Sequence, residues 1–146
     1  MTRTLIPSFQ TDRRLPRSRR LRRAGTIIAS AFAAVVIWII AVPVGGLDLV
    51  VRSGWSTQSV GLVSVAIVAV LAGAAGWATL AILERMVRSA RLIWTIVGSL
   101  VLVLSLLGPL SLAVGTGTVW VLLTMHVVVG ATLILGLTRF AVPRGE

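Results

Sequence analysis

Four long apolar stretches, free of Asp, Glu, Lys and Arg, make up well over half of the 146-residue chain. The hydrocarbon core of a bilayer is ~30 Å thick, so a helix that rises 1.5 Å per residue needs about 20 apolar residues to cross it. Every stretch reaches that length. The sequence therefore predicts an all-α integral membrane protein, an up-down-up-down bundle of four antiparallel transmembrane helices. The predicted spans are about residues 24–43, 60–83, 92–114 and 119–138.

The composition leaves no room for a separate soluble domain. Apolar residues make up 57% of the chain and charged residues 12%, whereas soluble domains are about 45–50% apolar and about 25% charged. We expect a basic, disordered cytoplasmic leader over residues 1–23, a transmembrane domain over 24–140 and a short cytoplasmic tail over 141–146. The sequence has no Cys, which excludes disulfides and thiolate metal sites.

The placement of charge predicts an orientation. All 14 basic residues are Arg, the net charge is +10, and eight of the arginines precede residue 24. The second loop and the tail carry further arginines, while the first loop has no net charge and the third has no charge at all. By the positive-inside rule, both termini and the second loop are cytoplasmic. A composition rich in Arg, Ala, Gly and Val is typical of GC-rich bacterial genomes, so we expect a bacterial plasma membrane.

The arginines before the first span also predict a partner. Each Arg near an anionic membrane surface contributes about 1 kcal/mol to binding. No aromatic or glycine pattern accompanies them, so we predict no nucleic-acid partner. The apolar run that follows is longer than the ~7–15 residues of a signal peptide, so we expect it to remain as a span. The residues predicted at lipid headgroups are Arg17, Arg19, Arg20, Arg22 and Arg23.

The first loop and the tryptophans give local predictions. Proline and paired glycines over Val42–Gly46 should end the first helix. Asp48 and Arg52 are four residues apart, a spacing that favours one short helical turn at the interface. Interfacial Trp residues are usually membrane anchors. We expect Trp55 and Trp120 at the outer interface, Trp94 at the inner one and Trp38 packed against a neighbouring helix.

Small residues in the second span predict close helix contacts. The pairs Ala69/Gly73 and Ala72/Gly76 have the small-xxx-small spacing that lets helix backbones approach in lipid. Because small residues nearly encircle this helix, we expect it to be the most buried of the four. The contact could lie within the bundle, which we favour, or join a second copy or a membrane partner. Gly130, in the fourth span, should admit a close neighbour in the same way.

His126 is the only ionisable residue within a predicted span, and such residues are functional candidates by default. Pro109 lacks an N–H, so the carbonyl of Ser105 loses its helical partner. Antiparallel neighbours would place that carbonyl level with His126, about 10 Å below the outer edge. We expect a polar cluster of His126, Ser105, Ser64 and Thr124.

Several functions are compatible with this cluster. A neutral, hydrogen-bonded structural histidine is the interpretation that we favour, and a proton or small-solute relay comes next. A single His cannot supply two axial haem ligands, and no predicted carboxylate or Cys lies nearby to support catalysis, so we predict no enzyme, cofactor or metal site. We expect a small non-enzymatic membrane protein that acts through helix packing. The alternatives are a transporter or channel component, and a cofactor-binding membrane anchor.

Three motifs and the Arg-rich leader together resemble a known family. They are the exit Val42–Gly46, the small-residue second span and the segment Met125–Gly130. Over about Arg20–Phe140 the chain is similar to a family of small four-span integral membrane proteins from actinobacteria, a family of unknown function. The resemblance implies a four-helix protein of the plasma membrane. It implies no activity, substrate or site residue.

Overall fold

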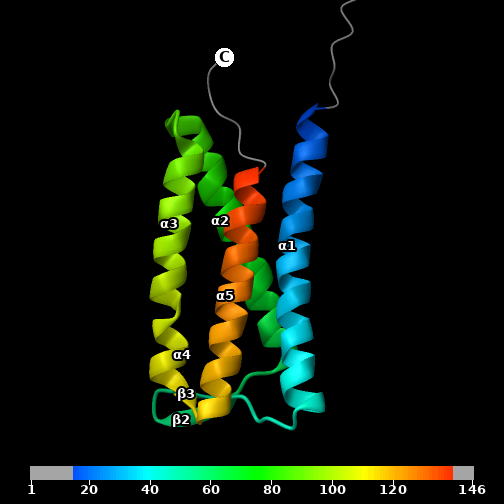
Figure 1. Cartoon of the computed structure of the whole chain (residues 1–146), viewed down its shortest axis with the longest axis vertical. Coiled ribbons are helices and arrows are strands. Elements are labelled where there is room, and N and C mark those ends of the chain that lie inside the picture. Colours follow the sequence, from blue (N-terminus) through cyan, green and yellow to red (C-terminus); the bar gives the residue numbers. More distant parts are fainter. Residues whose placement is uncertain (1–14, 140–146) are drawn as a thin grey trace, which may run out of the picture.

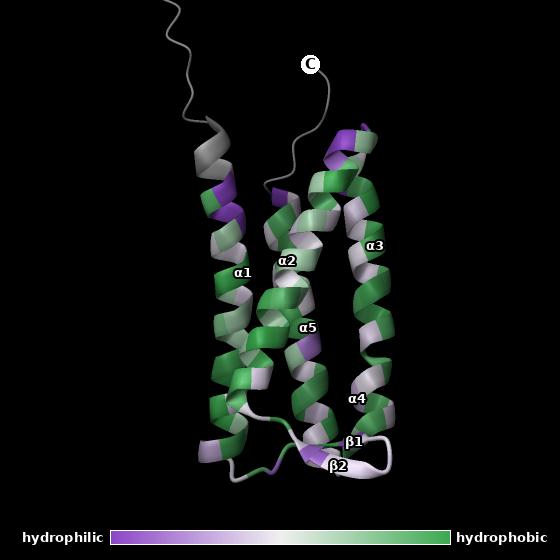
Figure 2. Cartoon of the chain, turned by 180° about the vertical axis from the view of Figure 1, so that it is seen from behind, coloured by the Kyte–Doolittle hydropathy of each residue, from purple (hydrophilic) through white to green (hydrophobic). Residues whose placement is uncertain are grey.

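The structure, a computed structural model, describes residues 15–139 of the chain, with side chains from residue 20 onward. Within this part, four helices are long and apolar enough to cross a membrane. They are Arg20–Val44, Leu62–Met86, Ala90–Leu112 and Thr116–Arg139. The predicted all-α fold with four spans is confirmed. Figure 2 shows hydrophobic residues along the helices and hydrophilic ones gathered at the two ends of the bundle.

Six helical segments make up these spans, because the first span ends in a π-helix and the third is broken in two. They are α1 (Leu15–Ile39), η1 (Ile40–Val44), α2 (Leu62–Met86), α3 (Ala90–Ser105), α4 (Leu107–Leu112) and α5 (Thr116–Arg139). Figure 1 shows α5 between α1 and α3, with α2 behind it. The start of α1 and the end of α5 lie at the same end of the bundle, here called the termini end. The β-strands lie at the opposite end, here called the sheet end.

The two ends of the first span differ in how well the sequence anticipated them. The helix begins at Leu15, so residues 15–23 are helical rather than disordered as predicted; the rest of the leader lies outside the described residues. At the other end, Pro43 lies in the π-helical turn and cannot donate a backbone hydrogen bond. The N–H of Gly45 donates to Ile40 O (2.9 Å), and Gly46, with φ +66°, turns the chain away. The structure therefore ends the helix where proline and glycine predict.

The loop after α1 forms a small sheet, and the predicted helical turn around Asp48 is wrong. The strands β1 (Val50–Ser53), β2 (Ser56–Ser59) and β3 (Ala113–Val114) pair antiparallel in the order β2-β1-β3. Two β-branched valines begin β1, and a two-residue turn joins it to β2. Gly54, with φ +61°, is the first central residue of that turn, the place where type II′ hairpin turns require glycine.

Small residues bring α1 and α2 together. Ala69 on α2 packs in one buried cluster with Ala31 and Ala34 of α1. A Cβ added to Gly73 would lie 2.8 Å from Ile27 Cγ2, too close for any larger residue unless Ile27 shifts. A second tight contact joins α5 to α3, where a Cβ at Gly130 would lie 2.6 Å from a Leu102 methyl group.

The prediction that α2 is the most buried helix is wrong. Of its most apolar window, 17% is buried, against 22% in both the first and the fourth span. The small residues on α2 face two ways. Those toward α1 are covered, while Ala72 and Ala75 on another face are exposed. Small side chains permit close packing but cannot fill a wide gap themselves, so this second face borders a cavity.

Candidate binding cleft

A cavity of about 580 Å³ lies between α2, α3 and α5. Figures 1 and 2 show its cause: α2 runs beside α3 at the termini end and crosses toward α1 at the sheet end, so that α2 and α3 diverge. Several lining residues are exposed in the middle of spanning helices, among them Val68 (63%) and Val101 (58%). The cavity is therefore a cleft that opens sideways, toward the hydrocarbon of a surrounding bilayer. We call it the α2–α3 cleft.

The lining of the cleft is almost wholly apolar. On α2 it consists largely of small residues, including Ala69, Ala72, Ala75 and Gly76. Apart from Trp94, whose indole N–H is buried, the described lining residues with polar side chains are Ser64, Thr79, Ser105 and His126. Three of the four residues of the predicted polar cluster thus line one cavity.

His126 projects from α5, ten residues after the helix begins at Thr116, so it lies ~15 Å along the helix from the sheet end. Its ring is half-buried, and its Nδ1 lies 2.7 Å from the carbonyl oxygen of Leu122, one turn earlier in the same helix. A carbonyl oxygen only accepts, so Nδ1 must donate and carries the proton. In a neutral imidazole the other nitrogen, Nε2, is then a bare acceptor. Among the described residues, none donates a hydrogen bond to Nε2.

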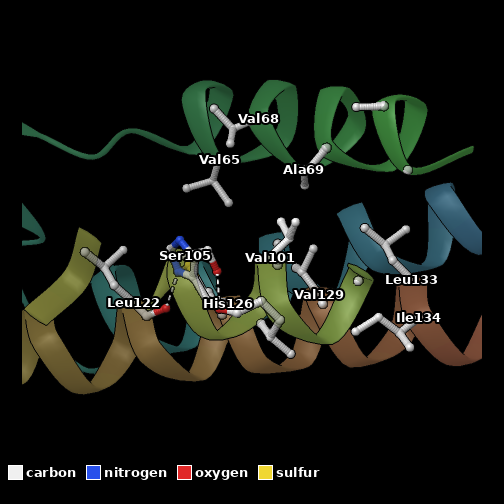
Figure 3. Close-up of a pocket in the computed structure, with 18 of the residues that line it drawn as sticks. Val65, Val68, Ala69, Val101, Ser105, Leu122, His126, Val129, Leu133 and Ile134 are labelled. Atoms are coloured by element: carbon white, nitrogen blue, oxygen red, sulfur yellow. Dashed lines mark hydrogen bonds between the residues drawn. The ribbon is translucent and has the colours of Figure 1, made fainter. Parts of the chain in front are cut away.

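Ser105 lies at the same end of the cleft as His126, across from Val65 of α2 (Figure 3). The predicted bond between the imidazole and the Ser105 carbonyl is not formed, because the ring reaches a carbonyl of its own helix instead. The Ser105 hydroxyl donates to Leu102 O (2.7 Å), also within its own helix. The third span is interrupted just before Pro109, since α3 ends at Ser105 and α4 begins at Leu107.

Thr124 does not belong to the cluster. It lies two residues from His126, about 200° around the helix, and therefore on another face. Its hydroxyl donates to Trp120 O (2.8 Å), and the side chain is exposed rather than directed into the cleft. Ser64, on α2, does line the cleft.

Arg23, predicted at lipid headgroups, is instead buried against a neighbouring helix. Its guanidinium pairs with Glu84 of α2 through two bonds, Nη2 to Oε1 (2.5 Å) and Nη1 to Oε2 (3.1 Å). The side chains are only 9% and 19% exposed. The sequence held a signal for this pair. Arg23 directly precedes the predicted first span and Glu84 directly follows the predicted second span, so antiparallel helices bring the two residues to the same level. Arg20 and Arg22 are exposed, and the side chains of Arg17 and Arg19 lie outside the described part.

The tryptophans differ in their exposure to the surroundings. Trp55 is fully exposed at the tip of the β1–β2 turn, and Trp120 is 66% exposed. Trp94, predicted at the interface, is buried instead against Leu80 and Leu137, where it closes the termini end of the cleft. Trp38 donates its Nε1–H to Val60 O (2.8 Å) in the segment that leads into α2, and so ties the first span to the second.

A family model of unknown function matches residues 14–143, nearly the whole chain. The chain belongs to the DUF6069 family. No curated protein and no solved structure matches it. Membership in DUF6069 carries no activity, so function must be argued from the cleft itself.

The polar groups that line the cleft of this DUF6069 protein can form hydrogen bonds with a guest. Of the described residues, no group of three His, Cys, Asp or Glu side chains is placed to hold a metal ion. His126 is the one titratable side chain among the described residues that line the cleft. Its neighbours there are hydroxyl and apolar groups, which can bind and orient a guest molecule but supply no second acid or base.

Proposed function

We propose that this DUF6069 protein is a non-enzymatic membrane protein that binds a lipid-like small molecule in the α2–α3 cleft. The observation that carries the proposal is a lateral opening between two spanning helices that leads to an imidazole deep in the apolar zone. Sites for small molecules are commonly ~300–1,000 Å³, mostly apolar, with a few polar groups that fix orientation. The cleft, at about 580 Å³, is of that kind.

The free nitrogen of His126 is the reason to expect a guest more specific than an acyl chain. A polar atom without a hydrogen bond in an apolar medium costs ~1–3 kcal/mol by mutational measures. Water is scarce at that depth in a bilayer, and a hydrocarbon chain offers no hydrogen bond. A guest that carries its own polar group would remove the cost while its apolar body fills the cleft.

A partner helix, from a second copy or another membrane protein, is the second candidate. It is favoured by Ala72, Ala75, Gly76 and Gly98, small lining residues of the sort found at helix contacts. Volume argues for the smaller guest. The cleft, at about 580 Å³, lies within the range of small-molecule sites.

The other functions gain less support from the geometry. Pumps and transporters usually string several ionisable groups along a path, whereas His126 is alone in the described lining of the cleft. A haem anchor would need a second axial ligand, and the chain has a single His.

We further propose that the termini end faces the cytoplasm of a bacterium, where its arginines meet anionic lipid headgroups. The support is the charge pattern. Among the described residues one arginine, Arg52, lies at the sheet end, and the others lie at the termini end. Reporter fusions at Gly54 and Gly117 should report outside, and a fusion at Ser89 inside. An outside signal at Ser89 would overturn the orientation.

Co-purification tests the binding function. The protein is extracted from native membranes, and bound small molecules are measured by native mass spectrometry and lipid analysis. Ala72→Phe fills the cleft, and Ala74→Phe is its matched control, because Ala74 is exposed on the same helix but does not line the cleft. We expect a guest bound to wild type and to Ala74→Phe, and lost from Ala72→Phe. Equal content of bound molecules in the two variants would overturn the proposal.

A further inference from the structure

The polar groups of the α2–α3 cleft are mostly acceptors, because their protons are already committed. His126 gives its Nδ1 proton to Leu122 O, and Ser105 gives its hydroxyl proton to Leu102 O. Thr79 does the same with Ala75 O, at 2.9 Å. Each of these bonds lies within one helix and does not depend on a guest. What remains for a guest is the lone pair of His126 Nε2 and the lone pairs of two hydroxyl oxygens.

Two groups that border the cleft, the Ser64 hydroxyl and the Trp94 indole, still have protons that no described residue accepts. The Ser64 hydroxyl has no hydrogen bond to any described residue, so it can donate or accept. The indole N–H of Trp94 borders the cleft, but its nitrogen is buried and out of contact with a guest. At the end where His126 and Ser105 lie together, Ser64 is the one described group with an uncommitted hydroxyl proton, whereas His126 Nε2 and Ser105 Oγ are acceptors without a donor.

From this donor–acceptor balance we infer that the guest is a neutral apolar molecule that carries an O–H donor, such as a long-chain or isoprenoid alcohol or a phenol. This inference rests on the proposed function of the cleft. The O–H donates to His126 Nε2, with Ser105 Oγ as a second acceptor, and the hydrocarbon body lies along the small residues of α2. Esters, ethers, ketones and quinones offer only acceptors. They could accept from Ser64, but they would leave His126 Nε2 without a donor.

The charge of the guest can also be inferred from the cleft. An ammonium group would donate hydrogen bonds too, but a cation at this depth in a bilayer is costly without an acidic partner. No described carboxylate lines the cleft. A carboxylate guest would bring a negative charge against bare acceptors. A neutral hydroxyl avoids both costs.

The test compares probes that share one body and differ in the donor. Wild type in nanodiscs is equilibrated with tritiated farnesol, which is displaced by unlabelled farnesol, farnesyl methyl ether or farnesal. A net hydrogen bond between neutral groups is worth enough to change affinity about tenfold. We expect farnesol to bind about tenfold more tightly than the ether or the aldehyde, and Ala72→Phe to abolish binding of all three.

Variants at His126 assign the preference to Nε2. His126→Phe keeps a ring of similar size without the acceptor, and it should bind farnesol and its ether equally. His126→Gln adds an amide donor, so it should bind farnesal more tightly than wild type does. Thr124→Val, which removes a hydroxyl outside the cleft, should leave the preference unchanged.

The outcomes separate the two claims. If all three probes bind wild type equally and Ala72→Phe releases them, the cleft binds its guest and the donor inference is overturned. If His126→Phe and His126→Gln both keep the preference for farnesol, the donor inference is also overturned. If no probe binds, or if Ala72→Phe binds as well as wild type, the proposed function fails and the inference with it.

Discussion

The two long edges of α2 are built from similar small residues, yet one is closed and the other is open. Toward α1, Ala69 and Gly73 are covered by Ile27, Ala31 and Ala34. Toward α3, contact is made near the termini end, where Gly76 meets Trp94. Farther along, α2 and α3 diverge and the cleft lies between them. Small-xxx-small spacing therefore permits close approach, but the neighbouring helix decides whether it occurs.

Ties at the ends of the helices account for the difference. The closed edge has a partly buried ion pair at the termini end, Arg23 with Glu84, and the Trp38 bond to Val60 O at the sheet end. The edge between α2 and α3 has a short connection at the termini end, with Leu80 and Trp94 packed beside it. At the sheet end, β3 joins the third span to β1 rather than to α2. The helices are thus held together at two levels on one side and at one level on the other.

The largest effect should come from breaking the ion pair of the closed edge. Arg23→Met leaves the partly buried Glu84 carboxylate without its main partner, which should lower the free energy of unfolding by about 3 kcal/mol. Arg20→Met, at an exposed position on the same helix, should change it by less than about 0.5 kcal/mol. Unfolding in mixed micelles measures both. The double variant Arg23→Met/Glu84→Met should recover part of the loss, and no recovery would show that the pair is not the tie.

Overpacking the closed edge should come next. Gly73→Leu drives a side chain into Ile27 and should cost about 2 kcal/mol of stability. Gly25→Leu is the control, because a Cβ at Gly25 meets no atom within 4 Å. The same unfolding assay applies. Equal stability of the two variants would mean that α1 and α2 do not touch at Gly73.

The smallest effect should come from the open edge, and it sharpens the comparison most. Ala69→Leu and Ala72→Leu add the same atoms to the same helix, three residues apart. Ala69 also borders the cleft, but it is 5% exposed and packs against Ala31 and Ala34, so its replacement should destabilise by about 2 kcal/mol. Ala72 lines the cleft and is exposed, so its replacement should change stability by less than about 0.5 kcal/mol. A similar loss in both variants would mean that the cleft is closed in the membrane.

Span positions were predictable because they depend on length and composition alone, and a run of about 20 apolar residues has few other solutions in a chain of this kind. The small hairpin was not. Asp48 and Arg52 have helical spacing, but Val50, Val51 and the Gly54 turn favour strands, and pairing with Ala113–Val114 from a distant loop decides the outcome. A pattern within one segment cannot report such a partner.

The site was predicted in part for a related reason. Depth along each helix follows from counting residues, and this placed Ser64, Ser105 and His126 in one cavity. Rotation and tilt do not follow from counting. Helix rotation directs Thr124 away from the cleft and lets His126 donate to a carbonyl of its own helix. Helix tilt separates α2 from α3. The burial of α2 was overestimated because small residues were taken to be covered on every side.

Photolabelling tests most directly whether the α2–α3 cleft holds a guest taken from the bilayer. A diazirine analogue of farnesol is activated in membranes that contain the protein, and labelled positions are mapped by peptide mass spectrometry. The account predicts labels at cleft residues such as Ala72 and Val101 that excess farnesol suppresses, over a weak, unsuppressed background at exposed residues outside the cleft. Suitable background positions are Leu71, Leu104 and Leu135. Uniform labelling of cleft and background positions, unaffected by farnesol, would contradict it.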